Sequence, residues 1–174
     1  MENIQYNIQF EKLCDTLDVG KLICDPEQVT GGLLHRMYSV ETTTGKYAVK
    51  TLNPQVMLRP KAKSDIVNGE RIAEIAADFI PALPAKKFGD KFLQQIDGQY
   101  YLVYDWIEGK SLYGENITVD HCEKIGGILG KLHNIDYINR DYLCYLECEL
   151  MRESANFAID NIYNELCATV RLNK

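Results

Sequence analysis

Apolar and polar side chains alternate along two neighbouring runs of the chain, residues 37–41 and 46–52. A period of two is typical of a β-strand, in which successive side chains point to opposite faces. The residues between the runs, 43–45, end in a glycine, which tolerates the positive φ of a short turn. The sequence therefore predicts a β-hairpin, with Ala48 and Lys50 on one face of its second strand.

A second hairpin is predicted around Asp97-Gly98, a strong two-residue turn signal. This pair separates residues 92–96 from residues 100–107. The later run is aromatic and apolar without interruption, which indicates a strand that is buried on both faces. The polar residues 55–64, between the two hairpins, are predicted to form a loop.

Four further segments place apolar side chains at spacings of three and four, the pattern of an amphipathic helix. They are residues 3–17, 64–80, 118–133 and 141–170, of which the last is one helix or two. Thr118 is the expected N-cap of the third segment. The apolar stripe of each helix is expected to face the core.

Gly31 and Gly32 precede the first hairpin and form a second place where the backbone can approach a bulky group. We expect Lys50 to be directed across the sheet toward this glycine turn. Glycine amides and a strand lysine suit the phosphates of a nucleotide. A common turn and a solvated lysine at a sheet edge explain the same residues, so both interpretations stay open.

Glu70 and Glu74 lie one turn apart on the predicted helix 64–80. If one of them reaches back to Lys50, an ion pair would hold the ammonium group ready for phosphate oxygens. The alternative is that both are solvated and pair with Arg71 or with no group, as most helix glutamates do.

The overall charge is acidic, with a formal net charge of −6 and a pI near 5.1. We therefore expect no nucleic-acid and no anionic-membrane partner, because both attract basic surfaces. No apolar run reaches the ~18 residues of a membrane span. The cysteines form no CxxC pair, and we expect no signal peptide, no metal site, reduced thiols and a cytoplasmic location. The six cysteines are Cys14, Cys24, Cys122, Cys144, Cys148 and Cys167.

An ordered set of short motifs resembles the aminoglycoside phosphotransferase and choline kinase-like family, whose small-molecule kinases share the protein-kinase fold. The set covers roughly residues 27–135. It comprises Gly31-Gly32, Tyr47-Ala48-Val49-Lys50, Glu70, Tyr104-Asp105-Trp106-Ile107-Glu108-Gly109 and Leu129-Gly130-Lys131-Leu132-His133.

The resemblance implies an α+β fold of the protein-kinase type. Residues 1–107 would form the N-terminal nucleotide-binding lobe, an antiparallel five-stranded sheet plus a helix. Residues 104–107 would be the hinge between the lobes. Residues 108–174 would be a partial helical C-terminal lobe.

The resemblance also implies ATP and magnesium as cofactors. Gly31, Gly32 and Lys50 would hold the phosphates, and Glu70 would orient Lys50. The adenine edge would bond to the Asp105 carbonyl and the Ile107 amide. Its apolar neighbours would be Ala48, Leu102 and Val103.

The sequence departs from the family at the chemical step. The family uses a His-x-Asp-x-x-x-x-Asn loop and a later metal-binding aspartate, and neither motif occurs here. His133 and Asp136 have the wrong spacing for this loop. We therefore expect no catalytic residue in this chain, magnesium ligands outside it, and a chain that ends before the loop and is inactive alone. His35 stands where the family often has a small polar residue, in the phosphate-contacting turn.

The expected function is ATP-dependent phosphoryl transfer to a hydroxyl of a small molecule, of the aminoglycoside or choline kinase type. One alternative is a pseudokinase-like module that binds a nucleotide or a protein without chemistry. Another is a plain α+β domain with a fortuitous hairpin. A homodimer through the C-terminal helices is also expected, because uncovered apolar side chains seek partners. These side chains are Leu146, Leu150, Tyr163 and Leu166.

Overall fold

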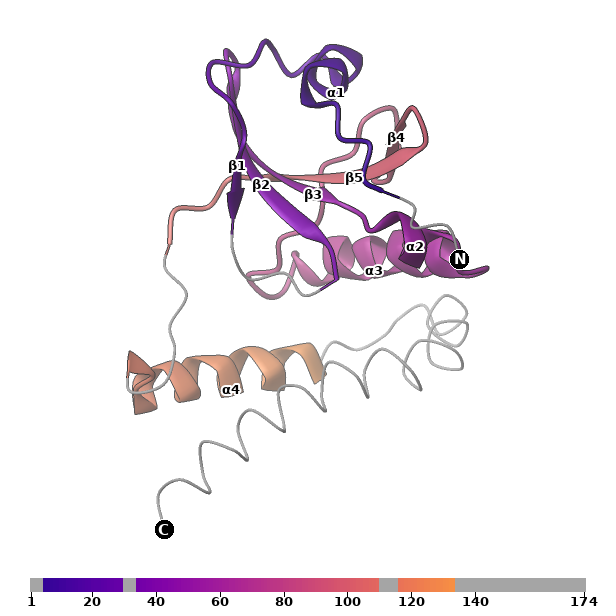
Figure 1. Ribbon diagram of the computed structural model, residues 1–174. Helices are drawn as coiled ribbons and strands as arrows, with labels where there is room; N and C mark the ends of the chain where they lie inside the picture. The colour runs from indigo at the N-terminus through magenta and orange to yellow at the C-terminus, as the bar shows by residue number, and fades with distance from the viewer. Residues whose placement is uncertain (1–4, 30–33, 110–115, 134–174) are drawn as a thin grey trace. The chain divides into compact units, whose positions relative to one another are not determined.

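The computed structural model of the 174-residue chain describes residues 5–29, 34–109 and 116–133. The chain divides into two compact units, Met1–Gly109 and Lys110–Lys174. Among the described residues, the first unit contains the sheet and three helices, and the second contains one helix (Figure 1). The expected helical segment 141–170 lies outside the described residues.

Within the described part of the first unit, five strands form a single antiparallel sheet (Figure 1). Its spatial order is β1-β2-β3-β5-β4. The strands are β1 (Glu27–Val29), β2 (Arg36–Thr42), β3 (Gly45–Thr51), β4 (Gln94–Ile96) and β5 (Gln99–Asp105). Both predicted hairpins are present, as the pairs β2–β3 and β4–β5. The expected α+β fold with an antiparallel five-stranded sheet is confirmed.

The helices differ from the prediction mainly at their ends. They are α1 (Phe10–Leu17), α2 (Pro54–Met57), α3 (Ala62–Ala76) and α4 (Val119–His133). The prediction of a loop over residues 55–64 was wrong, because α2 and the first turn of α3 lie there. Two local features start α2: Pro54 occupies its first turn, and the Asn53 side chain accepts a hydrogen bond from the Gln55 amide at 2.9 Å.

Tertiary hydrogen bonds explain why α1 begins at Phe10 and not at Asn3. The Asn7 amide donates to the Gln99 side chain at 3.2 Å, and the Gln9 amide donates to the Tyr101 hydroxyl at 3.0 Å. These backbone donors are therefore satisfied by β5 and remain outside the helix.

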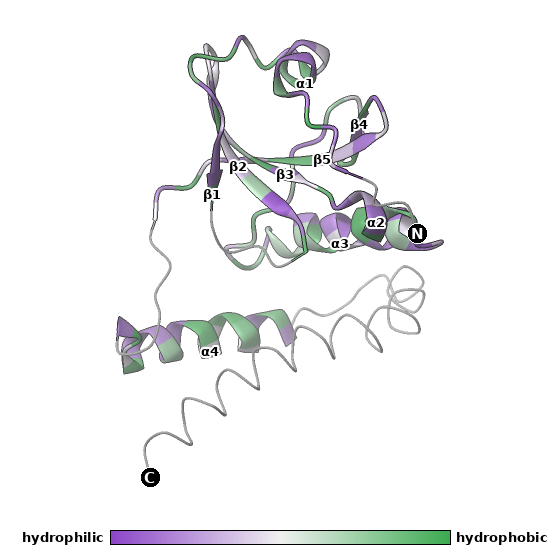
Figure 2. Ribbon diagram, in the orientation of Figure 1, coloured by the Kyte–Doolittle hydropathy of each residue, from purple (hydrophilic) through white to green (hydrophobic). Residues whose placement is uncertain are grey.

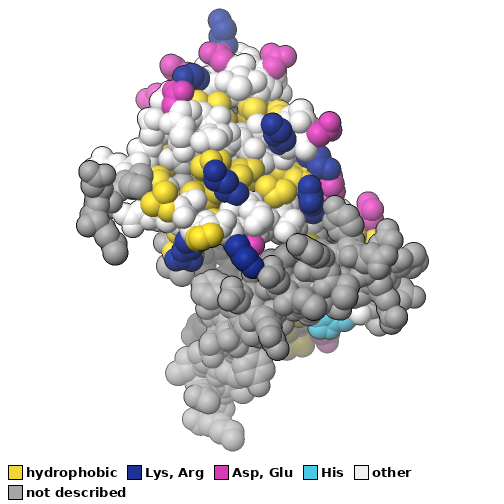
Figure 3. All heavy atoms as spheres, turned by 90° about the vertical axis from the view of Figure 1, so that its right-hand side faces the viewer, with side chains coloured by type: hydrophobic (Ala, Val, Ile, Leu, Met, Phe, Trp, Pro, Cys, Tyr) yellow, Lys and Arg dark blue, Asp and Glu magenta, His cyan; other side chains and the backbone are white. Residues whose placement is uncertain are grey.

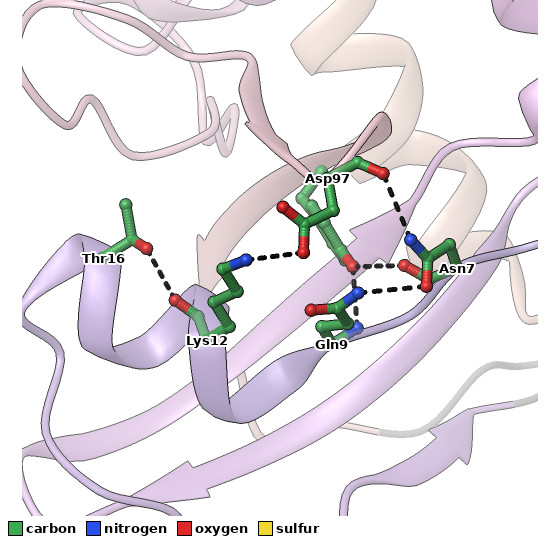
Figure 4. Close-up of polar contacts among 6 residues, drawn as sticks. Asn7, Gln9, Lys12, Thr16 and Asp97 are labelled. Carbon is green, nitrogen blue, oxygen red and sulfur yellow. Dashed lines mark hydrogen bonds and ion pairs between the residues drawn. The ribbon is translucent and has the colours of Figure 1, made fainter.

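The turn between β4 and β5 anchors this N-terminal segment (Figure 4). Lys12 lies 2.6 Å from the Asp97 carboxylate, and the Asn7 side chain donates to the Asp97 carbonyl at 3.1 Å. The hydrogen bond from Lys12 is the largest cause of the lowered pKa of Asp97. Asp97 and Gly98 have φ of 45° and 85°, the positive values that the Asp-Gly signal predicts.

One face of the sheet packs against α1. Leu13 and Cys14 of the helix join Val49 of β3 and Val103 of β5 in a buried cluster. Val103 is 2% exposed in this cluster and lies on the opposite face from Ala48, so these two expected neighbours of adenine do not share a face of the sheet. Neighbouring residues of a strand face opposite sides of the sheet. Val103 is paired with Val49 of β3, so both side chains point to the face that packs against α1.

The other face of the sheet packs against α2 and α3. Leu52 and Leu102 form its buried centre, with Met57 of α2 and Ala62 of α3. The middle of β5 is apolar in Figure 2. It supplies Leu102 to this face and Val103 to the other. The prediction that this strand is buried on both faces is confirmed.

In the second unit, the predicted helix 118–133 is confirmed as α4, along which apolar and polar segments alternate (Figure 2). The Thr118 carbonyl accepts the hydrogen bond of the Cys122 amide at 3.2 Å, and the Thr118 amide donates to the His121 ring at 3.0 Å. Thr118 therefore occupies the N-cap position. The side chain that accepts a hydrogen bond at this end of the helix is that of His121, and the amide that donates to it is that of Thr118. Among the described residues, no helix has the length and apolarity to cross a membrane.

Candidate functional site

The predicted lysine lies in the middle of the sheet, on β3. Lys50 is paired with Met37 of β2 and with Leu102 of β5. Ala48 is paired with Tyr104 of β5. Directly paired residues of antiparallel strands share a face, so Ala48, Lys50, Leu102 and Tyr104 all lie on the face that packs against α3. Lys50 is half-buried there.

Glu70 extends from α3 to the same region, but its partners are not the expected ones. The Tyr104 hydroxyl donates to Glu70 Oε1 at 2.7 Å. The Ala85 amide donates to Glu70 Oε2 at 2.7 Å. Within the described ranges, no ion pair joins Glu70 to Lys50. The expected pairing with Lys50 is therefore replaced by two hydrogen bonds that tie α3 to β5 and to the segment before β4.

The neighbouring acid, Glu74, is exposed and takes a different partner. Lys87 Nζ lies 2.6 Å from its carboxylate. Of the two glutamates that the sequence left open, Glu70 is thus the one that contacts the sheet. Glu74 is solvated, as the alternative interpretation predicted, but its partner is Lys87 and not Arg71.

Tyr104 is a site residue that the sequence analysis assigned only to the hinge. Burial raises the pKa of the Tyr104 hydroxyl, and the hydrogen bond to Glu70 and the charge of that carboxylate raise it further. The hydroxyl therefore stays protonated and acts as a donor to Glu70. In the sequence, the position of Tyr104 in an aromatic strand indicated that its ring is buried. It did not indicate that the hydroxyl has a polar partner.

His35 lies close enough to Lys50 for the two charges to interact. Burial lowers the pKa of the half-buried His35 ring, and the positive charge of Lys50 lowers it further. The ring Nδ1 accepts a hydrogen bond from the Asn53 amide at 3.0 Å. This bond requires an unprotonated Nδ1, so the neutral ring carries its proton on Nε2.

The predicted hinge, residues 104–107, begins within the last two residues of β5. The Asp105 carboxylate lies 2.6 Å from Lys86 Nζ. The Trp106 amide donates to the Lys46 carbonyl at 3.3 Å, and Lys46 Nζ lies 4.4 Å from the centre of the Trp106 ring. Ile107 is 62% exposed. Tyr104, Asp105 and Trp106 of the predicted hinge are therefore still bonded to or paired with β3, and Ile107 is the hinge residue beyond this pairing.

Cationic side chains lie beside apolar surface elsewhere in this unit. Figure 3 shows Lys and Arg side chains next to exposed apolar groups on one side of it. Lys63 Nζ lies 4.7 Å from the centre of the Tyr100 ring, and Lys87 Nζ lies 4.8 Å from that of Phe92. These contacts are typical of surface lysines whose stems cover aromatic rings.

Two of the predicted site residues, Gly31 and Gly32, lie outside the described residues. Their closure over Lys50 therefore stays a prediction. The structure brings together Ala48, Lys50, Glu70 and Tyr104 on one face of the sheet, and it places Asp105 and Ile107 at the end of β5.

Comparison with known proteins identifies the family. Residues 25–157 match the family described as the phosphotransferase enzyme family (APH). The chain belongs to this family. Its match includes β1 to β5, α2 to α4 and every predicted site residue. No curated protein matches this family member.

Solved structures that resemble the chain include two of the Mycobacterium tuberculosis PknI kinase domain. One is 17% identical with a TM-score of 0.42, and the match covers 66% of this chain and 47% of that domain. The other is 15% identical with a TM-score of 0.37, and the match covers 63% of this chain and 37% of that domain. This member of the phosphotransferase enzyme family therefore spans less than half of either kinase domain.

Proposed function

We propose that this chain supplies the nucleotide-binding lobe of an ATP-dependent phosphotransferase that acts on a hydroxyl of a small molecule. Membership of the phosphotransferase enzyme family supports the reaction class. The observation that carries the proposal is the position of Lys50, half-buried near the end of the central strand β3, on the face of the sheet that also holds Ala48 and packs against the helix of Glu70.

The chemistry of this face fits a nucleoside triphosphate. Lys50 would stabilise the negative charge of the α and β phosphates. The Asp105 carbonyl and the Ile107 amide would bond to the adenine edge, with Ala48 as an apolar neighbour. A neutral His35 ring beside Lys50 adds no second positive charge, and its Nε2 proton is a further possible donor to an anion.

Magnesium would neutralise charge on the phosphates when bound. In the described ranges, no three His, Cys, Asp or Glu side chains come together as a metal site, so we assign no magnesium ligand to them. The sequence holds no His-x-Asp-x-x-x-x-Asn motif, and we assign no catalytic base to this chain. The acceptor class stays open among amino alcohols, sugars and aminoglycosides, and the net charge of −6 favours a cationic one.

Thermal unfolding with ATP and Mg²⁺ tests this proposal. At ten times the dissociation constant, a ligand of the folded state should raise the melting temperature by about 3–6 °C. We expect this shift for the wild type and for Lys12→Met, whose lysine contacts Asp97 on the α1 side of the sheet. Lys50→Met should lose it. No shift in the wild type, or an equal shift in Lys50→Met, would contradict the proposal.

A further inference from the structure

The Glu70 carboxylate is held by two donors from separate parts of the chain. Each oxygen accepts one hydrogen bond of 2.7 Å, from the Tyr104 hydroxyl of β5 and from the amide of Ala85. Ala85 is 4% exposed. Hydrogen bonds to a carboxylate are short and stronger than those between neutral groups, so this pair fixes Glu70, and with it α3, against β5.

Lys50 lies on the same face of the sheet as Tyr104. Its direct partner on β5 is Leu102, and Tyr104 lies two residues further along that strand, on the same face. Such diagonal neighbours are close enough for long side chains to contact a common group. Lys50 and Tyr104, on neighbouring strands, thus share one face of the sheet, and Glu70 bonds to the tyrosine there.

The hydroxyl bond and the ion pair are alternatives of position, since each carboxylate oxygen could accept a second donor. The Tyr104 hydroxyl remains a donor at ordinary pH. While it and the Ala85 amide hold the carboxylate, no ion pair joins Glu70 to Lys50 among the described residues. Formation of that ion pair would move the carboxylate away from Tyr104. Loss of the hydroxyl bond is compensated in that arrangement by an ion pair with Lys50.

We propose that Tyr104 is a positioning residue that competes with Lys50 for the Glu70 carboxylate. While the hydroxyl holds Glu70, Lys50 lacks its acidic partner; when the bond opens, Glu70 pairs with Lys50 and orients it. The effect on nucleotide affinity rests on the function proposed above. The competition itself does not, because it concerns three residues of this chain and affects stability without any ligand.

Double-mutant cycles on thermal stability test the competition without a nucleotide. We compare Lys50→Met, Glu70→Gln and their combination, first with Tyr104 present and then in the Tyr104→Phe background. With Tyr104 present, the effects of the two substitutions should add. In Tyr104→Phe they should be coupled, so that Lys50→Met lowers the melting temperature by about 2–4 °C only where Glu70 is retained.

Additive effects in both backgrounds would overturn the proposal. Tyr104→Leu, which also removes the hydroxyl, gives the same test if Tyr104→Phe does not fold. Tyr101→Phe is the matched control: its buried hydroxyl accepts from Gln9 on the opposite face, so its removal should lower stability without coupling Lys50 to Glu70.

Calorimetric titration with ATP and Mg²⁺ then tests the role in the nucleotide site. Tyr104→Phe should bind about two- to fivefold more tightly than the wild type, the fold-change that corresponds to one weak ion pair. Tyr104→Phe in the Glu70→Gln background should equal Glu70→Gln alone. Weaker or unchanged binding by Tyr104→Phe would mean that the hydroxyl is only structural and would overturn the positioning role. A wild type that binds no ATP would instead refute the proposed function, and the stability cycles would still decide the competition.

Discussion

His35 is the residue whose protonation is most directly connected to the structure of the candidate site. The neutral ring accepts the Asn53 amide at Nδ1, and both burial and the charge of Lys50 keep its pKa low. Protonation would remove the acceptor and place two positive charges side by side. The folded chain therefore favours the neutral ring.

The pH dependence of stability follows from this preference. The unfolded chain has the ordinary histidine pKa of 6.5 and the folded chain a lower one, so the unfolded state binds its proton first as the pH falls. The stabilisation is complete above pH 6.5 and is lost as the pH falls through the folded pKa. Melting temperatures between pH 7.5 and pH 5 should therefore fall more steeply in the wild type than in His35→Gln. Equal slopes would contradict this account of His35.

At the same scale, the site shows what sequence could and could not predict. The shared face of Ala48 and Lys50 was predictable, because alternation along one strand fixes it. The partner of Glu70 was not. Its carboxylate bonds to Tyr104 and to the Ala85 amide and not to Lys50. The spacing of residues along a helix does not predict which groups of other elements lie close enough to bond.

At the scale of elements, glycine has opposite effects on stability at two positions. It is favourable in the turn between β4 and β5 and unfavourable in the middle of α3. Gly98 has a φ of +85°, which side chains other than glycine rarely adopt. Gly69 lies within α3, where glycine is the poorest helix former after proline. A Cβ at either position would meet no atom within 4 Å, so backbone conformation alone separates them.

Two alanine substitutions of opposite effect test this difference. Gly98→Ala should lower the free energy of unfolding by about 1–2 kcal/mol, because alanine is strained at positive φ. Gly69→Ala should raise it by up to about 1 kcal/mol, because alanine is the better helix former. Urea unfolding of both variants beside the wild type measures the two effects. A stabilising Gly98→Ala, or a destabilising Gly69→Ala, would show that contacts rather than backbone conformation dominate at that position.

Local signals explain which elements were predictable. The Asp97-Gly98 pair fixes its turn through its own φ preference. Asn53-Pro54 starts α2 through a cap and a proline in the first turn, although the prediction for residues 55–64 was a loop. The start of α1 depends on β5, because Gln99 and Tyr101 bind the preceding amides. Partners about 90 residues away in sequence leave no local pattern.

At the scale of the whole molecule, the sheet separates two environments. Its α1 face is a closed core that includes Val49 and Val103. Its α3 face carries, beside a second core, the half-buried Lys50 and the Glu70–Tyr104 hydrogen bond. In this member of the phosphotransferase enzyme family, the candidate nucleotide-binding residues thus lie on one side of the sheet, and the N-terminal helix α1 packs on the other.

The central claim is that Lys50 lies beside the phosphates of a bound nucleotide. An acyl-phosphate derivative of ATP tests it most directly, since a lysine amine next to the phosphates attacks the acyl carbon, forms an amide and releases ATP. Mass spectrometry then locates the acylated lysine. We predict acylation at Lys50, and protection of Lys50 by excess ATP. Acylation spread over surface lysines such as Lys12 and Lys63, with Lys50 unmodified or unprotected, would contradict the account.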